Sequence, residues 1–155
     1  MIQIVLRGGP ALLFIDQALA LNARLALPEN VYYFSYPCSA TVQNPDGTWS
    51  PIRSKMEYHY RVDSERMGHY TGVTPGGFIL DESWQENDGL VNTISAKAPL
   101  GQPSVRFDAA NVRPGVWNVM PTYPGDHMSL QGGLMKKNDV RGFYADLLNR
   151  LNALP

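Results

Sequence analysis

The chain has 155 residues, 44% of them hydrophobic, which is enough to bury the core of one domain. Thirteen Lys and Arg residues against fourteen Asp and Glu give a net charge of −1, so no overall field would attract nucleic acid or an anionic membrane. Fourteen glycines and twelve prolines indicate long, ordered loops. We therefore expect a single domain over residues 1–155, with no nucleic-acid partner.

The first predicted element is a helix from Ala11 to Leu27, ended by Pro28. Polar residues such as Asp16 interrupt its apolar run, so it predicts a buried helix and no transmembrane segment. The opening residues Met1 to Gly9 lack the cleavage site of a signal peptide, so no signal peptide is expected in this stretch.

Strand signals follow. Val31 to Tyr36 is β-branched and aromatic, and we expect a central strand there. Asn44 to Gly47 predicts the turn of a hairpin. Leu90 to Ser95 predicts a short strand or extended segment, and Ala98 to Pro124 a long loop with an extended piece at Val116 to Met120. Helix followed by buried strand is typical of an α/β fold.

The last segment carries one continuous apolar stripe and predicts an outer helix from Asp139 to Leu154 that docks on a sheet. Asn138 or Asp139 would cap its first turn. The stripe consists of Val140, Phe143, Tyr144, Leu147, Leu148, Leu151 and Leu154.

Two loop residues stand out as candidates for chemistry. Asp88 lies between Asn87 and Gly89, where a turn residue is the simplest interpretation, and His127 lies in a Pro- and Gly-rich loop before the last helix. Either residue alone would be structural more often than catalytic. Their order, acid then histidine with a helix after the histidine, is that of the Ser, Asp, His triad of α/β-hydrolases.

Three stretches then resemble a known family. The sequences ENDGLVNTISA, GVWNVMPTYPGDHMSLQGG and VRGFYADLLNRLNALP are similar to the C-terminal part of bacterial secreted triacylglycerol lipases, the staphylococcal and thermophilic bacillus group. ENVYYFSYPCSA resembles the strand that precedes the acid in the same enzymes, so the likeness runs from Asn30 to Pro155. The resemblance implies that Asp88 is the catalytic acid, that His127 is the catalytic base, and that the protein is secreted.

A nucleophile is missing from the 155 residues. No Gly-x-Ser-x-Gly occurs, and the nearest string is Gly72-Val73-Thr74-Pro75-Gly76. Pro75 has no backbone N–H to donate to an oxyanion, so Thr74 is not expected to replace the serine. The serines Ser35, Ser39 and Ser95 are read as strand or turn residues.

The sequence predicts neither a cofactor site nor a metal site. The resemblance implies a calcium site formed by carboxylates after the histidine, but Met128 to Leu134 contains none, so we expect no cofactor and a lost calcium site. His59 and His69 are expected to serve surface or aromatic-packing roles, and Cys38 to fill the core. The Met- and aromatic-rich zone around Glu57 to Tyr60 fits ordinary packing or the wall of an acyl-chain groove.

The sequence thus predicts an α/β fold, the C-terminal portion of an α/β-hydrolase that lacks the strands carrying the nucleophile elbow. Its expected function is to supply Asp88 and His127 to a Ser-Asp-His triad that hydrolyses acyl esters of lipids, with the serine on a missing N-terminal half. The chain alone is expected to be inactive. A non-catalytic lipase remnant and an interaction module on the same scaffold remain as alternatives.

Overall fold

The computed structural model describes residues 11–133 and 139–154, with side chains from residue 15 onward. Three parallel strands form its main sheet in the order β1-β7-β6. Two antiparallel hairpins, β2-β3 and β4-β5, stand apart from that sheet. The strands are β1 (Tyr33–Ser35), β2 (Thr41–Gln43), β3 (Trp49–Pro51), β4 (Gly72–Val73), β5 (Ile79–Leu80), β6 (Ser104–Arg106) and β7 (Trp117–Val119).

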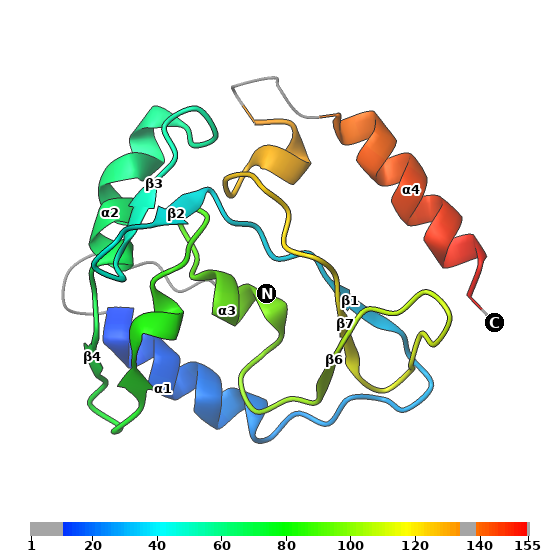
Figure 1. The fold of residues 1–155 in the computed structure, drawn as a ribbon. Coiled ribbons are helices and arrows are strands. Elements are labelled where there is room, and N and C mark those ends of the chain that lie inside the picture. The colour runs from blue at the N-terminus through cyan, green and yellow to red at the C-terminus, as the bar shows by residue number, and fades with distance from the viewer. Residues whose placement is uncertain (1–10, 134–138, 155) are drawn as a thin grey trace.

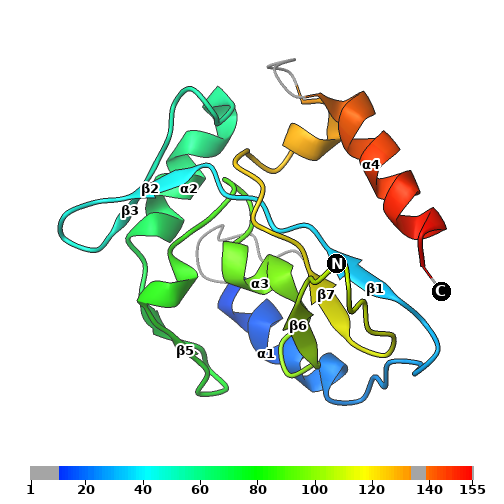
Figure 2. The ribbon, with the colours of Figure 1, turned by 45° about the vertical axis from the view of Figure 1, so that its right-hand side comes forward.

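Helices surround the sheet (Figure 1), with α3 and α4 on opposite sides of it in both ribbon views (Figure 2). Short 3-10 turns precede α2, α3 and α4. The helices are α1 (Ala11–Asn22), α2 (Arg61–Gly68), α3 (Thr93–Lys97) and α4 (Val140–Asn152), and the 3-10 turns are η1 (Tyr58–Tyr60), η2 (Glu82–Trp84) and η3 (Ser129–Gln131). No helix within the described ranges is both long and apolar enough to cross a bilayer.

The sheet departs from the sequence-based expectation in two places. β1 pairs only with β7 and is an edge strand of the described sheet, so the prediction of a central strand is wrong for this chain. β6 was not predicted, because its three residues follow Pro103 and look like loop. The extended piece at Val116 to Met120 is confirmed as β7, in register with β1 from Tyr33↔Trp117 to Ser35↔Val119.

Two elements differ in the structure from what the sequence predicts, one in its end point and one in its conformation. α1 stops at Asn22 instead of Leu27, because i→i+3 hydrogen bonds from Arg24 and Leu25 tighten the chain into a turn ahead of Pro28. Leu90 to Ser95 is not a strand: α3 starts inside it, with Asn92 as its N-cap.

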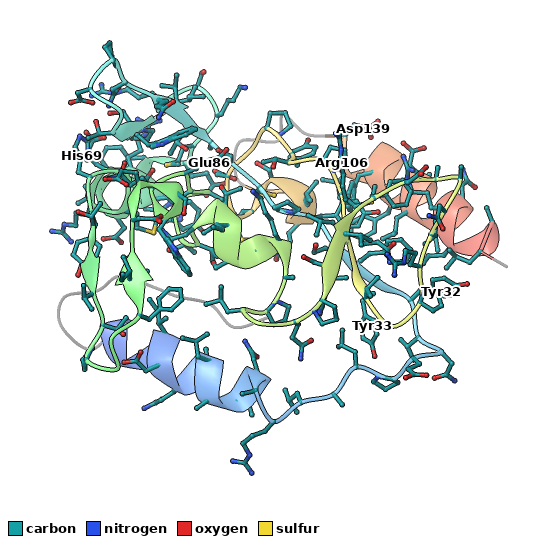
Figure 3. The ribbon with its side chains drawn as sticks, turned by 60° about the horizontal axis from the view of Figure 1, so that its bottom comes forward. Tyr32, Tyr33, His69, Glu86, Arg106 and Asp139 are labelled. Atoms are coloured by element: carbon teal, nitrogen blue, oxygen red, sulfur yellow. The ribbon has the colours of Figure 1, made fainter. Side chains whose placement is uncertain are left out.

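The predictions of the hairpin turn and of the last helix with its cap are confirmed. The turn at Asn44 to Gly47 joins β2 to β3, and α4 begins after Asp139, whose carboxylate accepts a hydrogen bond from the Gly142 N–H at 2.8 Å. Asp139 lies at the start of α4 in Figure 3. The Phe143 ring of α4 meets Tyr36, the residue after β1, edge-on at 5.0 Å. No residue of α4 is buried, so the prediction that its whole apolar stripe docks on the sheet is wrong for the described chain.

A hydrophobic cluster joins α1 to the middle of the chain. Ile15 of α1 packs with Leu80 and Trp84. The Asp16 carboxylate accepts hydrogen bonds from the Thr74 hydroxyl at 2.5 Å and from the Gly76 N–H at 2.7 Å, which ties α1 to the β4-β5 hairpin. This cluster supports the segment that leads through η2 to Asp88.

Candidate active site

Asp88 and His127 meet at the carboxyl ends of β1 and β7. The chain leaves β1 through Cys38 and leaves β7 through Tyr123, and these two residues form a parallel bridge. Ala40, in the segment that follows Cys38, donates its N–H to the Asn87 carbonyl at 3.1 Å. Loops beyond the carboxyl ends of parallel strands are the usual place for ligand sites in α/β sheets.

Two hydrogen bonds link the acid to the histidine. The His127 Nδ1 lies 2.9 Å from Asp88 Oδ2, and the His127 backbone N–H donates to the Asp88 carbonyl at 2.9 Å. Both side chains are largely covered, with 7% of the Asp88 side chain and 18% of the His127 side chain exposed. The separation falls in the range expected for a base oriented by a carboxylate.

The acid is held by its own turn. Asp88 Oδ1 accepts the Leu90 N–H at 3.0 Å and the Val91 N–H at 2.7 Å, which leaves Oδ2 for the imidazole. This side-chain bonding bends the chain, and it explains why residues 90–92 lead into a helix where a strand was expected. The turn role and the histidine contact therefore belong to the two oxygens of one carboxylate.

Asn87 fixes that turn from the other side and is fully buried. Its amide donates to the Ser64 carbonyl of α2 at 3.1 Å and to the Gln85 carbonyl at 2.9 Å, and its oxygen accepts the Gly89 N–H at 3.0 Å. Nothing in the local sequence predicts this role. The Asn-Asp-Gly string signalled a turn, but no local pattern points to a partner 23 positions away.

The surroundings of His127 shift its pKa upward. The hydrogen bond to Asp88 raises the pKa of His127 above its ordinary value, burial opposes this rise, and the charges of Asp88 and Asp126 add to it. An ionised carboxylate can only accept, so a hydrogen bond to Asp88 Oδ2 places a proton on Nδ1 and leaves Nε2 as the second ring nitrogen. Nε2 has no hydrogen-bond partner within residues 11–133 and 139–154.

No hydroxyl of the described chain approaches His127 as a nucleophile would. The Ser35 hydroxyl donates to the Lys97 carbonyl, the Ser95 hydroxyl donates to the Asn92 carbonyl, and Ser39 pairs with Thr41. Thr74 is 4% exposed and its hydroxyl is held by Asp16, so the structure agrees with rejecting it. Burial, and then the nearby carboxylates of Asp88 and Asp126, raises the pKa of the Cys38 thiol to about 12, as suits a core residue.

The other candidates lie elsewhere. His69 is near the end of α2, across the molecule from Tyr32 and Tyr33 (Figure 3), and its ring contacts the Glu65 carbonyl at 2.8 Å. His59 stacks on Tyr60 at 3.9 Å, so the two histidines have separate packing roles as predicted. Across the described part of the chain, no three His, Cys, Asp or Glu residues form a metal-binding group.

The Met- and aromatic-rich zone divides into core and surface. Met56 and Met67 are fully buried, whereas Tyr58 is 83% exposed. Met56 lies against Gly89, beside the acid turn. The methionines thus fill the core beneath the site, which is the packing interpretation of this zone.

Comparison with known proteins relates the chain to lipases. The family model described as "Lipase-like, C-terminal domain" matches residues 10–153. A lipase of Staphylococcus epidermidis is 30% identical over 118 residues, and lipase 1 of Staphylococcus aureus is 27% identical over 118 residues. Each match covers 76% of this chain and 16% of the relative, so the chain spans about a sixth of the length of these relatives.

Solved structures share the fold. The Staphylococcus hyicus lipase superposes with a TM-score of 0.75 at 26% identity, covering 88% of this chain and 34% of that one. EstA from Clostridium botulinum superposes with a TM-score of 0.80 at 29% identity, covering 91% of this chain and 33% of that one. The mixed helices and strands of this chain therefore match part of a lipase fold, and the chain belongs to the lipase-like, C-terminal domain family.

Proposed function

We propose that this chain, one partial domain over residues 1–155, supplies the acid Asp88 and the base His127 of a Ser-Asp-His triad that hydrolyses acyl esters of lipids. The serine would come from sequence outside these residues, in the portion of an α/β-hydrolase fold that carries the nucleophile elbow. The observation that carries the proposal is the 2.9 Å contact between His127 Nδ1 and Asp88 Oδ2. Family membership and relatives that bear the name lipase support it.

In the proposed reaction, each of the two side chains has one step to perform. His127 Nε2 takes the proton of the serine hydroxyl as the oxygen attacks the ester carbonyl, and then returns it to the leaving alcohol. Asp88 keeps the proton on Nδ1 and stabilises the imidazolium that forms. In the second half-reaction, Nε2 activates the water that releases the fatty acid. The likeness to secreted lipases further suggests that the protein works outside the cell.

Calcium does not fit after His127. Residues 128–133 contain no carboxylate, and the carboxylate of the neighbouring Asp126 already accepts N–H and O–H donors on both oxygens. A hard cation needs several oxygen ligands free of such donors. We propose that this loop binds no calcium, so the melting temperature of the chain should be the same in calcium and in EDTA. A calcium-dependent rise would contradict this.

The test of function begins with the coding sequence upstream, read in all three frames for a Gly-x-Ser-x-Gly that follows a strand. The 155-residue chain should not hydrolyse p-nitrophenyl esters or emulsified triglyceride, because it provides no nucleophile. The chain extended by that upstream sequence should hydrolyse both. There, His127→Ala should lower kcat by roughly three or more orders of magnitude, and His69→Ala should have no effect.

Each result separates the alternatives. Unrelated sequence and a stop codon upstream would favour a non-catalytic remnant or an interaction module. Ester hydrolysis by the 155 residues alone, lost in Thr74→Ala and kept in His127→Ala, would refute the assignment of both the base and the missing serine.

A further inference from the structure

We propose that Asp126 is a positioning residue, whose buried carboxylate fixes the loop that presents the His127 imidazole to Asp88. The inference rests on the proposed function for its catalytic meaning. Its structural content concerns the orientation of the ring and can be measured without substrate.

The contacts of Asp126 extend in two directions. Its Oδ2 accepts the backbone N–H of Glu57 at 2.8 Å, a residue 69 positions earlier in the chain. Its Oδ1 accepts the Met128 N–H at 3.2 Å and the Ser129 hydroxyl at 2.9 Å. Only 2% of the residue is exposed. A carboxylate so deeply buried is tolerated because its oxygens are hydrogen-bonded, and each bond to a charged acceptor is stronger than a neutral one.

These contacts hold the backbone just before and just after His127, separately from the contacts of Asp88. The His127 N–H is bound to the Asp88 carbonyl, which fixes the backbone toward the acid turn. Asp126 fixes the same backbone toward Glu57, at the start of η1, and toward Ser129, at the start of η3. With both anchors present, the imidazole has one position relative to Asp88. A misplacement of about 1 Å in such a group can cost a hundredfold in rate.

Asp126 also places a negative charge near the His127 ring. A residue that only supported the loop would have no such effect on the ring. The ionisable groups close to this place are the carboxylates of Asp88, Asp126 and the largely buried Glu57, the His59 ring 3.6 Å from Glu57, the Cys38 thiol and the Tyr60 phenol. After the hydrogen bond and the charge of Asp88, the charge of Asp126 further raises the pKa of His127. Removing that charge should therefore change the titration of His127 even when the loop keeps its shape.

The experiment is the NMR titration of the His127 ring in the 155-residue chain, compared with Asp126→Asn. The control is Asp81→Asn. Like Asp126, Asp81 accepts a nearby backbone N–H and a nearby serine hydroxyl, both from Ser83, but it is exposed. In Asp126→Asn, the titration midpoint of His127 should move down, by less than in Asp88→Asn, and the Nδ1–H resonance should broaden. In Asp81→Asn, both should match the original chain.

Ser129→Ala keeps the test decisive if Asp126→Asn does not fold, because it removes one donor and leaves the charge. It should accelerate exchange of the His127 amide about tenfold, as expected when one supporting hydrogen bond is lost. An unchanged titration in folded Asp126→Asn, or unchanged exchange in Ser129→Ala, would overturn the proposal. If the extended chain fails to hydrolyse esters while these shifts occur, the proposed function fails and the positioning role stands.

Discussion

At the scale of single residues, the Asp88 carboxylate shows how one side chain serves fold and chemistry together. One oxygen closes the turn through the Leu90 and Val91 N–H groups, and the other holds His127. An asparagine could keep the first function, because its amide oxygen accepts the same N–H groups. It would lose the second, because its NH2 group cannot accept the imidazole proton.

This division predicts a pH effect of Asp88→Asn. The folded pKa of His127 is raised, so its stabilising contribution is fully present below the ordinary value of about 6.5 and is lost as pH rises through the folded pKa. Urea unfolding at a series of pH values should show this loss in the original chain and a smaller one in Asp88→Asn. Asp81→Asn should follow the original chain, and an identical pH dependence in Asp88→Asn would contradict the assignment.

Gly89 predicts a second effect at the same turn. Its φ of +99° lies in the left-handed region, and a Cβ there would lie 2.7 Å from Tyr60 Cβ. Gly89→Ala should therefore lower the free energy of unfolding by roughly 1–3 kcal/mol, from backbone strain and overpacking together. Urea denaturation can measure this against Gly47→Ala, where φ is +91° and no atom lies within 4 Å. Equal losses would show that strain alone acts.

At the scale of elements, the sequence predicted the features whose hydrogen bonds lie within a few residues of one another. The cap at Asp139 and the turn at Asn44 to Gly47 use backbone bonds within a few residues, and both were predicted correctly. β6 depends on a neighbour strand and has only three residues, so no periodicity reveals it. The start of α3 was missed because the Asp88 side chain redirects the chain before it.

In the candidate site, too, contacts between residues distant in sequence could not be predicted from local patterns. Asp88 and His127 were found through family resemblance, since nothing local brings together residues 39 positions apart. The roles of Asn87 and Asp126 were not predicted, because their partners, Ser64 in α2 and Glu57 just before η1, are distant in sequence. Only the aspartate in a Gly-rich loop carried a signal, since an Asp side chain in a turn often accepts the backbone N–H two residues on, as Asp126 does from Met128.

The cap of α4 gives a prediction for an element. Asp139→Ala removes the side-chain acceptor of the Gly142 N–H and should reduce the free energy of unfolding by about 1 kcal/mol. Asp146→Ala on the exposed middle of α4 is the matched control and should change little. The comparison needs only thermal or urea unfolding of the two variants. A loss in Asp146→Ala equal to that in Asp139→Ala would remove the capping explanation.

At the scale of the whole molecule, apolar surface is left uncovered in the described chain. β1 has a strand neighbour on one side only, and α4 exposes Tyr144, Leu148 and Leu151 at i, i+4 and i+7. An open strand edge and an exposed apolar stripe both favour association between chains.

We therefore expect the 155-residue chain to self-associate. Sedimentation velocity should show species larger than the 17.2 kDa monomer, increasing with concentration. Leu148→Lys should shift the distribution toward monomer, and Val42→Lys, at an exposed position on β2, is the control for added charge. A monomer with a cooperative melt at high temperature would contradict this expectation.

The exposed turn between β6 and β7 lies between the acid and the base in the sequence, which allows a segment to be inserted there. Asp88 and His127 are anchored by the neighbours Asn87 and Asp126, while residues 108–111 form an exposed turn between β6 and β7. Exposed turns accept added segments with little cost. A peptide tag or an attachment point for a solid support can therefore be placed at residues 108–111, where the chain between acid and base tolerates a change of length.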